Sequence, residues 1–228
     1  MSIVECIDVK KTYQQGKVEV DALKGVSLSI DKGGFVALAG PSGSGKTTML
    51  NMIGGLDTAD SGRIIVDGNE YEKMNQSQLA DLRLRNVGFV FQSYNLIPVL
   101  SALENVEFVM LLQGVPSDKR REKAKAILDE VGLEGMYNRR PAELSGGQQQ
   151  RVAVARAIVS DPSIVLADEP TANLDSTTGK GLLEIMKQMN EKKKVTFIFS
   201  THDNMVMRYA RRVIYLRDGM VADEQVKK

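Results

Sequence analysis

A wholly apolar run at residues 35–39 leads directly into the glycine-rich segment 40–47, and a helix-compatible stretch follows. An unbroken apolar run of this length is typical of a strand buried on both faces of a parallel sheet. The segment fits the pattern G-x-x-x-x-G-K-S/T, in which backbone N–H groups close around phosphate oxygens and the helix terminus favours negative charge. The residues expected at the phosphates are Gly40, Pro41, Ser42, Gly43, Ser44, Gly45, Lys46, Thr47 and Thr48. This order of strand, loop and helix predicts an α/β fold that holds a nucleotide by its phosphates.

Two side chains of this segment carry specific chemistry. Lys46 is expected to supply a mobile cation for the β and γ phosphates, and the hydroxyl group of Thr47 is expected to bind Mg²⁺. The alternative is a glycine-rich turn with an incidental lysine. The complete motif and its flanking strand and helix patterns favour the phosphate site.

Two more apolar runs, 164–167 and 195–199, end at polar residues, and helical patterns separate the three runs. This alternation favours a mainly parallel sheet of the α/β class. Asp-Gly pairs at 67–68 and 218–219 each follow an apolar stretch, which is a hairpin signal. We therefore expect some antiparallel sheet near both ends of the chain.

The middle of the chain has a helical pattern. Ser117 is expected to cap a helix with one apolar face, and Gly132 is placed to end it. The sequence contains no internal repeat, low-complexity tract or flexible linker. We expect one domain over residues 1–228, with a helical subdomain inserted at about 93–159.

The apolar run 164–167 ends at an acidic pair, Asp168 and Glu169. Ligand sites of α/β proteins gather at such strand ends. Asp168 is expected to help hold Mg²⁺, and Glu169 is expected to act as the general base toward water. An acidic pair alone is more often a turn or a helix cap, but the phosphate-binding motif favours the catalytic interpretation.

The composition is that of an ordinary globular domain, with 43% hydrophobic residues, 26% charged residues and a formal net charge of +1. Because the charge is nearly balanced, we expect no direct nucleic-acid binding. A single cysteine excludes an internal disulfide and fits a reducing compartment. With no secretory pattern at the N-terminus and no stretch apolar enough to span a bilayer, the sequence predicts a cytoplasmic location.

The segment 144–148, Leu-Ser-Gly-Gly-Gln, lies between the phosphate motif and the acidic pair and resembles the signature sequence of the ABC ATPase family. Further residues match that family in order along nearly the whole chain, namely Tyr13, Gln92, Asp175 and His202. The resemblance implies a P-loop NTPase core with a mainly parallel sheet, an antiparallel β subdomain and the inserted helical subdomain. It also implies that the chain binds ATP and Mg²⁺.

The resemblance assigns a role to each matching residue. Tyr13 would stack on adenine, Gln92 would approach Mg²⁺ or water, and His202 would contact the γ-phosphate. The residues expected to meet the nucleotide of a second copy are Ser145, Gly146, Gly147, Gln148 and Asp175. The expected catalytic set is Glu169, His202, Gln92 and Lys46, and the expected metal-binding set is Thr47, Gln92 and Asp168.

Several of these roles have a simpler alternative. Tyr13 could be a packing residue of an N-terminal strand, Gln92 a surface glutamine and His202 a structural histidine. Asp175 could cap an ordinary helix. Ser145 is also placed to cap a helix, which would create a second phosphate-binding helix terminus.

For function, the resemblance implies the ATP-binding and ATP-hydrolysing subunit of an ABC transporter, acting as a homodimer on integral membrane permease subunits at the inner face of the cell membrane. Segments 91–98 and 103–106 resemble the ATPases of lipoprotein-releasing and macrolide-export systems, whose relatives also handle peptide-type substrates. The alternatives are a soluble ABC ATPase that acts on nucleic acid or ribosomes, and a small-molecule kinase. One phosphate motif, one signature and no long heptad segment disfavour the nucleic-acid alternative, and the kinase is disfavoured because the signature segment has no role in its chemistry.

A partner surface is expected near residues 92–112, in a groove between the core and the helical insertion that would receive a short helix of the permease. The apolar side chains expected there are Tyr94, Leu96, Ile97, Val99, Leu100, Phe108 and Met110. Glu104 and Glu107 would orient a basic partner.

Overall fold

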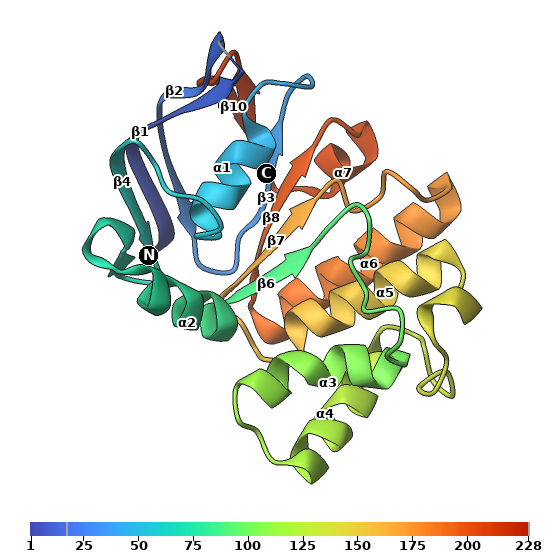
Figure 1. The fold of residues 1–228 in the computed structure, drawn as a ribbon. Coiled ribbons are helices and arrows are strands. Elements are labelled where there is room, and N and C mark those ends of the chain that lie inside the picture. The colour runs from blue at the N-terminus through green and yellow to red at the C-terminus, as the bar shows by residue number, and fades with distance from the viewer. Residues whose placement is uncertain (17, 228) are drawn as a thin grey trace.

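The computed structural model describes residues 1–16 and 18–227, which form two β-sheets with helices between and around them (Figure 1). The larger sheet has six strands in the order β10-β9-β3-β8-β7-β6. Its strands are β3 (Phe35–Ala39), β6 (Val87–Val90), β7 (Ile164–Asp168), β8 (Thr196–Thr201), β9 (Arg212–Arg217) and β10 (Met220–Val226). All neighbours are parallel except β9 and β10. The mainly parallel sheet predicted from the apolar runs is thus confirmed.

The smaller sheet is antiparallel throughout, in the order β2-β1-β4-β5. Its strands are β1 (Ser2–Gln15), β2 (Val18–Asp31), β4 (Ser61–Val66) and β5 (Asn69–Glu70). Both Asp-Gly pairs connect antiparallel neighbours, the first between β4 and β5 and the second between β9 and β10. Antiparallel structure therefore occurs near both ends of the chain, as expected.

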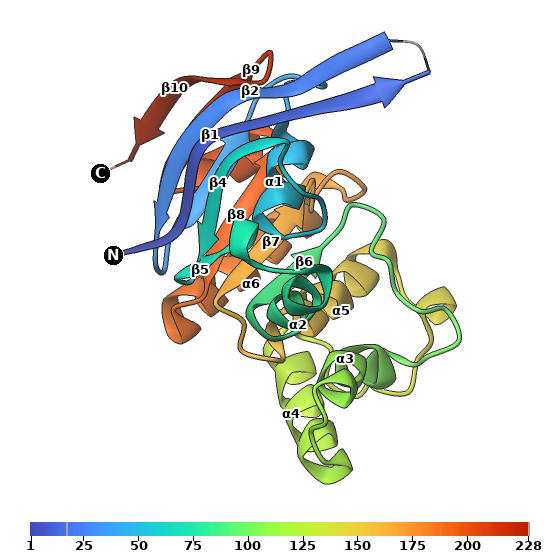
Figure 2. The same ribbon diagram turned by 60° about the vertical axis from the view of Figure 1, so that its left-hand side comes forward.

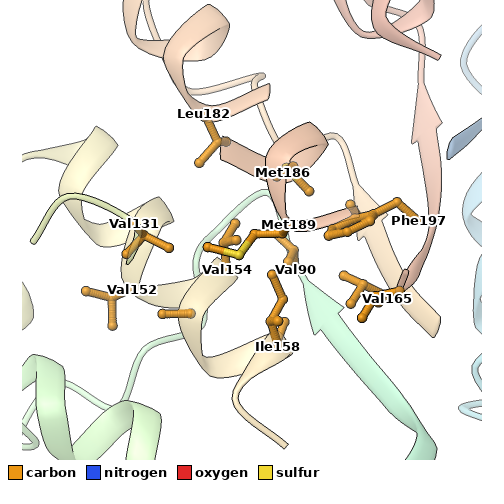
Figure 3. Packing of buried hydrophobic residues seen from close by; sticks show 14 of the residues in the cluster. Val90, Val131, Val152, Val154, Ile158, Val165, Leu182, Met186, Met189 and Phe197 are labelled. Atoms are coloured by element: carbon orange, nitrogen blue, oxygen red, sulfur yellow. The ribbon is translucent and has the colours of Figure 1, made fainter. Parts of the chain in front are cut away.

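The two faces of the six-stranded sheet are buried in different layers, because alternate residues of a strand point to opposite faces. Val36 and Leu38 of β3 face the core that also contains α1 (Lys46–Ile53) and the antiparallel sheet. Phe35 and Ala37 face the opposite core, which is built largely by α5 (Gly146–Ile158) and α6 (Ser176–Lys193) (Figure 3). Strands β3, β7 and β8 thus lie between two apolar layers, which explains the apolar runs in their sequences.

The other helices have these bounds: α2 (Gln76–Asn86), α3 (Ala102–Leu112), α4 (Ser117–Glu130), α5 (Gly146–Ile158), α6 (Ser176–Lys193) and α7 (Asn204–Tyr209). Short 3₁₀ turns lie at Tyr71–Lys73 and Pro141–Glu143. In the part of the chain that the structure describes, none of these helices has the length and apolar character needed to cross a membrane.

Helices α3 and α4 lie together at the end of the molecule away from the antiparallel sheet (Figure 2). They pack with α5 in the same buried cluster, and α4 contributes Ala124, Ile127 and Leu128 to it. Ser117 does not cap α4 as expected: it is the first helical residue, and Pro116 in the cap position offers no side-chain hydrogen bond. Proline before the first turn presets the backbone, so this helix starts without a polar cap. The insertion boundaries at 93–159 stay a prediction.

Candidate functional site

The loop after β3 has the backbone shape that a phosphate cradle requires. Gly45 has φ +99°, and a Cβ atom there would lie 2.6 Å from the carbonyl oxygen of Ala22. Gly40 has φ +150°, and its Cβ atom would collide with the carbonyl oxygen of Leu216. Only glycine fits these two positions without displacing a neighbouring strand or loop. The loop then runs into α1 at Lys46, so backbone N–H groups and a helix terminus lie together.

Lys46 is nearly buried, at 7% exposure, and its Nζ atom donates to the carbonyl oxygens of Gly40 and Pro41, both at 2.9 Å. This ammonium group is therefore already held against the loop, where a phosphate would meet it. A cavity of about 440 Å³ opens beside it. Of the expected site residues, those that line this cavity are Ser42, Gly43, Gly45, Lys46, Thr47, Thr48, Gln92, Asp168, Glu169 and His202.

Sheet order explains why these distant segments meet. Strand β8 pairs in parallel with both β3 and β7, and β6 pairs in parallel with β7. The carboxyl ends of all four strands therefore lie at one edge, and the residues just beyond them converge. Gln92 follows β6, Asp168 ends β7, and His202 follows β8.

Thr47 and Asp168 provide the oxygens expected for a metal. The Thr47 hydroxyl group lies 3.1 and 3.3 Å from the two carboxylate oxygens of Asp168. A hydroxyl and a carboxylate on the edge of a phosphate loop fit Mg²⁺, which is usually held by one or two protein oxygens plus phosphates and water. Within residues 1–16 and 18–227 no group of three His, Cys, Asp or Glu side chains could hold a metal ion without such additional ligands.

Glu169 is held on both carboxylate oxygens by the end of β8. Its Oε2 atom accepts from the Thr201 hydroxyl group at 3.1 Å, and its Oε1 atom accepts from the His202 backbone N–H at 3.1 Å. The His202 Nδ1 atom also lies 2.6 Å from Oε1. Glu169 has φ +44°, an uncommon backbone conformation for a side chain of this type that is often found at active sites.

The loop that carries Gln92 is fixed by three long polar side chains. Gln150 of α5 donates to the carbonyl oxygen of Phe91 at 3.4 Å, and Asn173 donates to that of Gln92 at 3.0 Å. Arg156, also on α5, donates to the carbonyl oxygens of residues 94 and 95. Burial lowers the pKa of the Arg156 guanidinium group. The Gln92 loop is thus attached to the helix that begins at the signature segment.

The signature residues form a second group outside the Lys46 cavity. Ser145 caps α5, accepting from the backbone N–H of Gln148 at 3.3 Å, while the Gln148 side chain accepts from the Ser145 N–H at 2.9 Å. The helix cap predicted from the sequence is confirmed. None of Ser145, Gly146, Gly147 and Gln148 lines the cavity beside Lys46.

Asp175 belongs to this second group, because Thr178 links it to the signature segment. Gly147 lies so close to Thr178 that a Cβ atom at Gly147 would collide with it, and the Thr178 hydroxyl group donates to Asp175 at 2.6 Å. Asp175 caps α6, as in the alternative interpretation, accepting from the N–H groups of Thr177 and Thr178. The Thr178 side chain and backbone hydrogen bonds lower the pKa of the Asp175 carboxyl group. Contact of Asp175 with a second copy stays a prediction.

Tyr13 lies beside the cavity without lining it. It pairs across the hairpin with Val20, which does line the cavity. Its hydroxyl group donates to the Asp57 carboxylate at 2.7 Å. Burial, and then this bond, raise the pKa of Tyr13 to about 12. Gly40, Pro41 and Ser44 likewise do not line the cavity; they form the part of the loop behind it.

A second hollow, of about 500 Å³, lies between the core and the helical region. Its apolar lining includes Leu56, Leu84, Phe89, Val109 and Leu112. Of the residues predicted for the partner groove, Met110 is wrong, because it is only 1% exposed and belongs to the core. The other apolar residues named do not line this hollow, and their contact with a partner stays a prediction.

Glu104 does not face this groove with a free carboxylate, because it accepts from the Ser101 N–H at 2.8 Å in the capping box of α3. The Ser101 backbone and side-chain hydrogen bonds lower the pKa of the Glu104 carboxyl group. A side chain that completes a helix cap contributes to folding, so it is a poor probe of partner binding.

Sequence reasoning missed Thr201, Asp57, Gln150 and Arg156. Thr201 could have been found, because it is a polar residue at the end of an apolar strand next to His202. Asp57, Gln150 and Arg156 carry no comparable signal, since their partners are defined only by tertiary packing.

Comparison with known proteins agrees with this geometry. A sequence profile of the ABC transporter family matches residues 23–172. An uncharacterized ABC transporter ATP-binding protein of Thermotoga maritima is 46% identical over 96% of this chain and 93% of its own length. The macrolide export ATP-binding/permease protein MacB of Syntrophobacter fumaroxidans is 46% identical over 98% of this chain, which spans only 32% of that relative's length.

Solved structures give the same result. A dimeric ATP-binding cassette of Methanocaldococcus jannaschii, in a post-hydrolysis state bound to ADP and Pi, superimposes with a TM-score of 0.91 at 44% identity over 99% of both chains. These relatives give no support to the alternative of an ATPase acting on nucleic acid. The chain therefore belongs to the ABC transporter family, as an ATP-binding and ATP-hydrolysing subunit.

Proposed function

We propose that this chain hydrolyses ATP in a site shared between two copies and uses that cycle to drive an integral membrane permease. The observation that carries the proposal is the separation of the site residues into two groups. The group around Lys46 lines one cavity, while the signature segment and Asp175 lie outside it. Since one chain does not bring both groups to the same nucleotide, a second copy in a head-to-tail arrangement would complete each site.

In the proposed reaction, Lys46 and the loop N–H groups bind the phosphates of ATP, and Tyr13 contacts the adenine. Glu169 takes a proton from the attacking water, and Thr201 and His202 hold its carboxylate in position for that step. Thr47, Asp168 and Gln92 would hold Mg²⁺, which would neutralise phosphate charge. His202, whose side chain is 70% exposed, would reach the γ-phosphate.

The second half of the proposed site is the N-terminus of α5 from the other copy. Ser145 is exposed and already uses its side chain to cap the helix, so the free N–H groups of the first turn are aimed outward. Such a terminus attracts a phosphate. The dimeric state of similar cassettes supports this arrangement.

For the partner, we propose a permease that works in lipoprotein release or in export of macrolide or peptide-type substrates. The MacB relatives, which join an ATP-binding part to a permease part, support this class. The chain would then lie at the inner face of the cell membrane, held there by the partner. The hollow between core and helical region, with exposed Leu56 and Leu112, is the surface best suited to an apolar helix of that partner.

The test is purification of the chain from its own membranes, with identification of the integral membrane protein that accompanies it. Leu112→Asp introduces a charge into the groove and should abolish copurification while ATP hydrolysis by the isolated chain stays unchanged. Met220→Asp is the matched control, because Met220 is similarly exposed, at 49% against 57% for Leu112, but lies on the edge strand β10. Copurification of a permease with the Leu112 variant at the wild-type level would show that this groove is not the docking site.

A further inference from the structure

The strand β1 carries two side chains toward one acidic loop. Lys11 and Tyr13 are two residues apart, so they point to the same face of the strand. Both contact Asp57, which lies in the loop between α1 and β4: the Tyr13 hydroxyl group donates to Oδ2 at 2.7 Å and the Lys11 Nζ atom to Oδ1 at 3.2 Å. The carboxylate thus uses one oxygen for each partner.

Lys11 also restricts the aromatic ring itself. Its Nζ atom lies over the ring of Tyr13, 5.2 Å from the ring centre, within the range of a cation–π interaction. The Lys11 side chain is only 12% exposed and donates in addition to the carbonyl oxygen of Thr58 at 2.8 Å. Because this cation covers one face of the ring, only the other face can receive a flat ligand.

The loop after α1 holds the strand as well as its side chains. Asp60 accepts from the backbone N–H of Thr12 at 2.7 Å, and the Asp60 N–H donates to the carbonyl oxygen of Lys10 at 2.9 Å. This loop follows α1, whose first residue is Lys46. The phosphate-binding helix and the strand carrying Tyr13 are therefore connected through residues 57–60.

We infer that Asp57 is a positioning residue for ATP binding, which fixes the ring of Tyr13 at the adenine position relative to the phosphate loop. The inference rests on the proposed function, in which Tyr13 contacts adenine. A ring fixed before the nucleotide arrives loses less conformational freedom on binding, so the fixed ring gives tighter binding of the base. Phosphate contacts do not depend on it.

The ionisation states suit this role at neutral pH. Burial raises the pKa of the Asp57 carboxyl group, but hydrogen bonds from Tyr13, Thr58 and Lys11 outweigh burial and bring that pKa below its ordinary value. The pKa of Tyr13 is raised to about 12, so its hydroxyl group carries its proton at neutral pH. The donor and the charged acceptor are therefore both present at neutral pH.

The test is equilibrium binding of ATP and of inorganic tripolyphosphate, each with Mg²⁺, to the full chain and its variants. Asp57→Ala should weaken ATP binding about two- to tenfold, the effect of losing one such hydrogen bond. Asp57→Asn, which keeps an acceptor oxygen for Tyr13, should recover part of that loss. Tyr13→Ala should weaken ATP about 5- to 150-fold, since it removes the stacking surface. Tripolyphosphate, which has no base, should bind every variant equally.

Steady-state kinetics provide a second measurement, in which Asp57→Ala should raise KM with little change in kcat. The matched control is Tyr209→Phe, because the Tyr209 hydroxyl group also donates to a carboxylate, that of Glu184 at 2.6 Å, but between α7 and α6. It should leave ATP affinity unchanged.

Three results would overturn the inference. Weaker ATP binding in Tyr13→Ala with unchanged binding in Asp57→Ala would exclude positioning by Asp57 while leaving the adenine role of Tyr13 intact. Equal losses for ATP and tripolyphosphate in Asp57→Ala would indicate a general structural defect. Unchanged ATP binding in Tyr13→Ala would remove the proposed role of Tyr13 and the inference together.

Discussion

Both side-chain oxygens of Glu169, which lines the cavity beside Lys46, are held by residues 201 and 202. Thr201 and His202 hold its two oxygens, and its backbone N–H donates to the carbonyl oxygen of Ser200 at 2.9 Å. A carboxylate oriented in this way can accept a proton from water without first rearranging. The restraint comes from strand β8, so the position of the base depends on the register between β7 and β8.

Glu169→Gln should retain ATP and Mg²⁺ binding but slow single-turnover cleavage by about a hundred- to ten-thousand-fold, the usual contribution of a general base. The amide keeps the size of the side chain and cannot take the proton. Rapid-quench measurement of ATP cleavage at saturating nucleotide gives the rate directly. A decrease of only about twofold would rule out Glu169 as the base.

Lys46→Ala should weaken ATP binding and abolish measurable turnover, because the phosphate charges lose their nearest cation. The lysine also bridges two loop carbonyl groups, so a control must show that losing such a lysine bridge elsewhere in the chain does not by itself reduce nucleotide binding. Lys227 makes a comparable bridge, from its Nζ atom to the carbonyl oxygens of Met207 and Arg208 at 2.6 and 2.9 Å. Lys227→Ala should leave nucleotide binding unchanged, and wild-type turnover in Lys46→Ala would contradict the assignment.

At the level of elements, the helix cap formed by the signature segment can be separated from its proposed contact with a nucleotide. Ser145 closes a capping box on α5, and Ser101 closes the same box on α3, with Glu104 in the third position. Removing either hydroxyl group should lower the free energy of unfolding by about 1 kcal/mol. Only Ser145→Ala should also slow ATP hydrolysis, because only that helix terminus is proposed to meet a nucleotide.

Denaturant unfolding and ATPase assays on the two serine variants make this comparison. Equal slowing of hydrolysis in both variants would mean that the lower stability alone causes the loss of ATPase activity. The proposed nucleotide contact of the signature helix would then be incorrect.

The elements differ in how far their sequences predict them. Strand β3 is apolar throughout, and β7 and β8 each contain an apolar run, because both of their faces are buried; that pattern is visible without a structure. Helix α4 shows the limit: the sequence pattern predicts its apolar face correctly but predicts Ser117 as the cap, whereas Pro116 occupies that position. A serine before an apolar pattern fits the cap and the first turn almost equally well, so the sequence does not separate them.

The residues of the candidate site also differ in how far the sequence predicts their positions. Residues that stand in a contiguous motif or directly after an apolar strand, such as Lys46, Asp168 and His202, are predictable because local order determines their position. The contacts that hold these side chains in place are not predictable from the sequence. Tyr13 reaches Asp57 across 44 positions and Arg156 reaches Tyr94 across 62, and such pairs follow from sheet order and helix packing.

At the scale of the whole molecule, a single helix joins the two halves of the proposed site. Helix α5 begins at the signature, and its Gln150 and Arg156 hold the loop that carries Gln92 in the other group. A movement of the signature helix would therefore be transmitted to the cavity of the same chain. This connection gives a physical reason for two copies to close on their nucleotides together.

The most direct test of the shared site is sedimentation velocity of Glu169→Gln with Mg²⁺ and either ATP or ADP, over a range of protein concentrations. Because the slowed base preserves ATP, the variant should sediment as a dimer with ATP and as a monomer with ADP. The monomer–dimer equilibrium should depend on protein concentration. An ATP-saturated variant that stays monomeric at every concentration, while the wild-type chain hydrolyses ATP at full rate under the same conditions, would contradict the account.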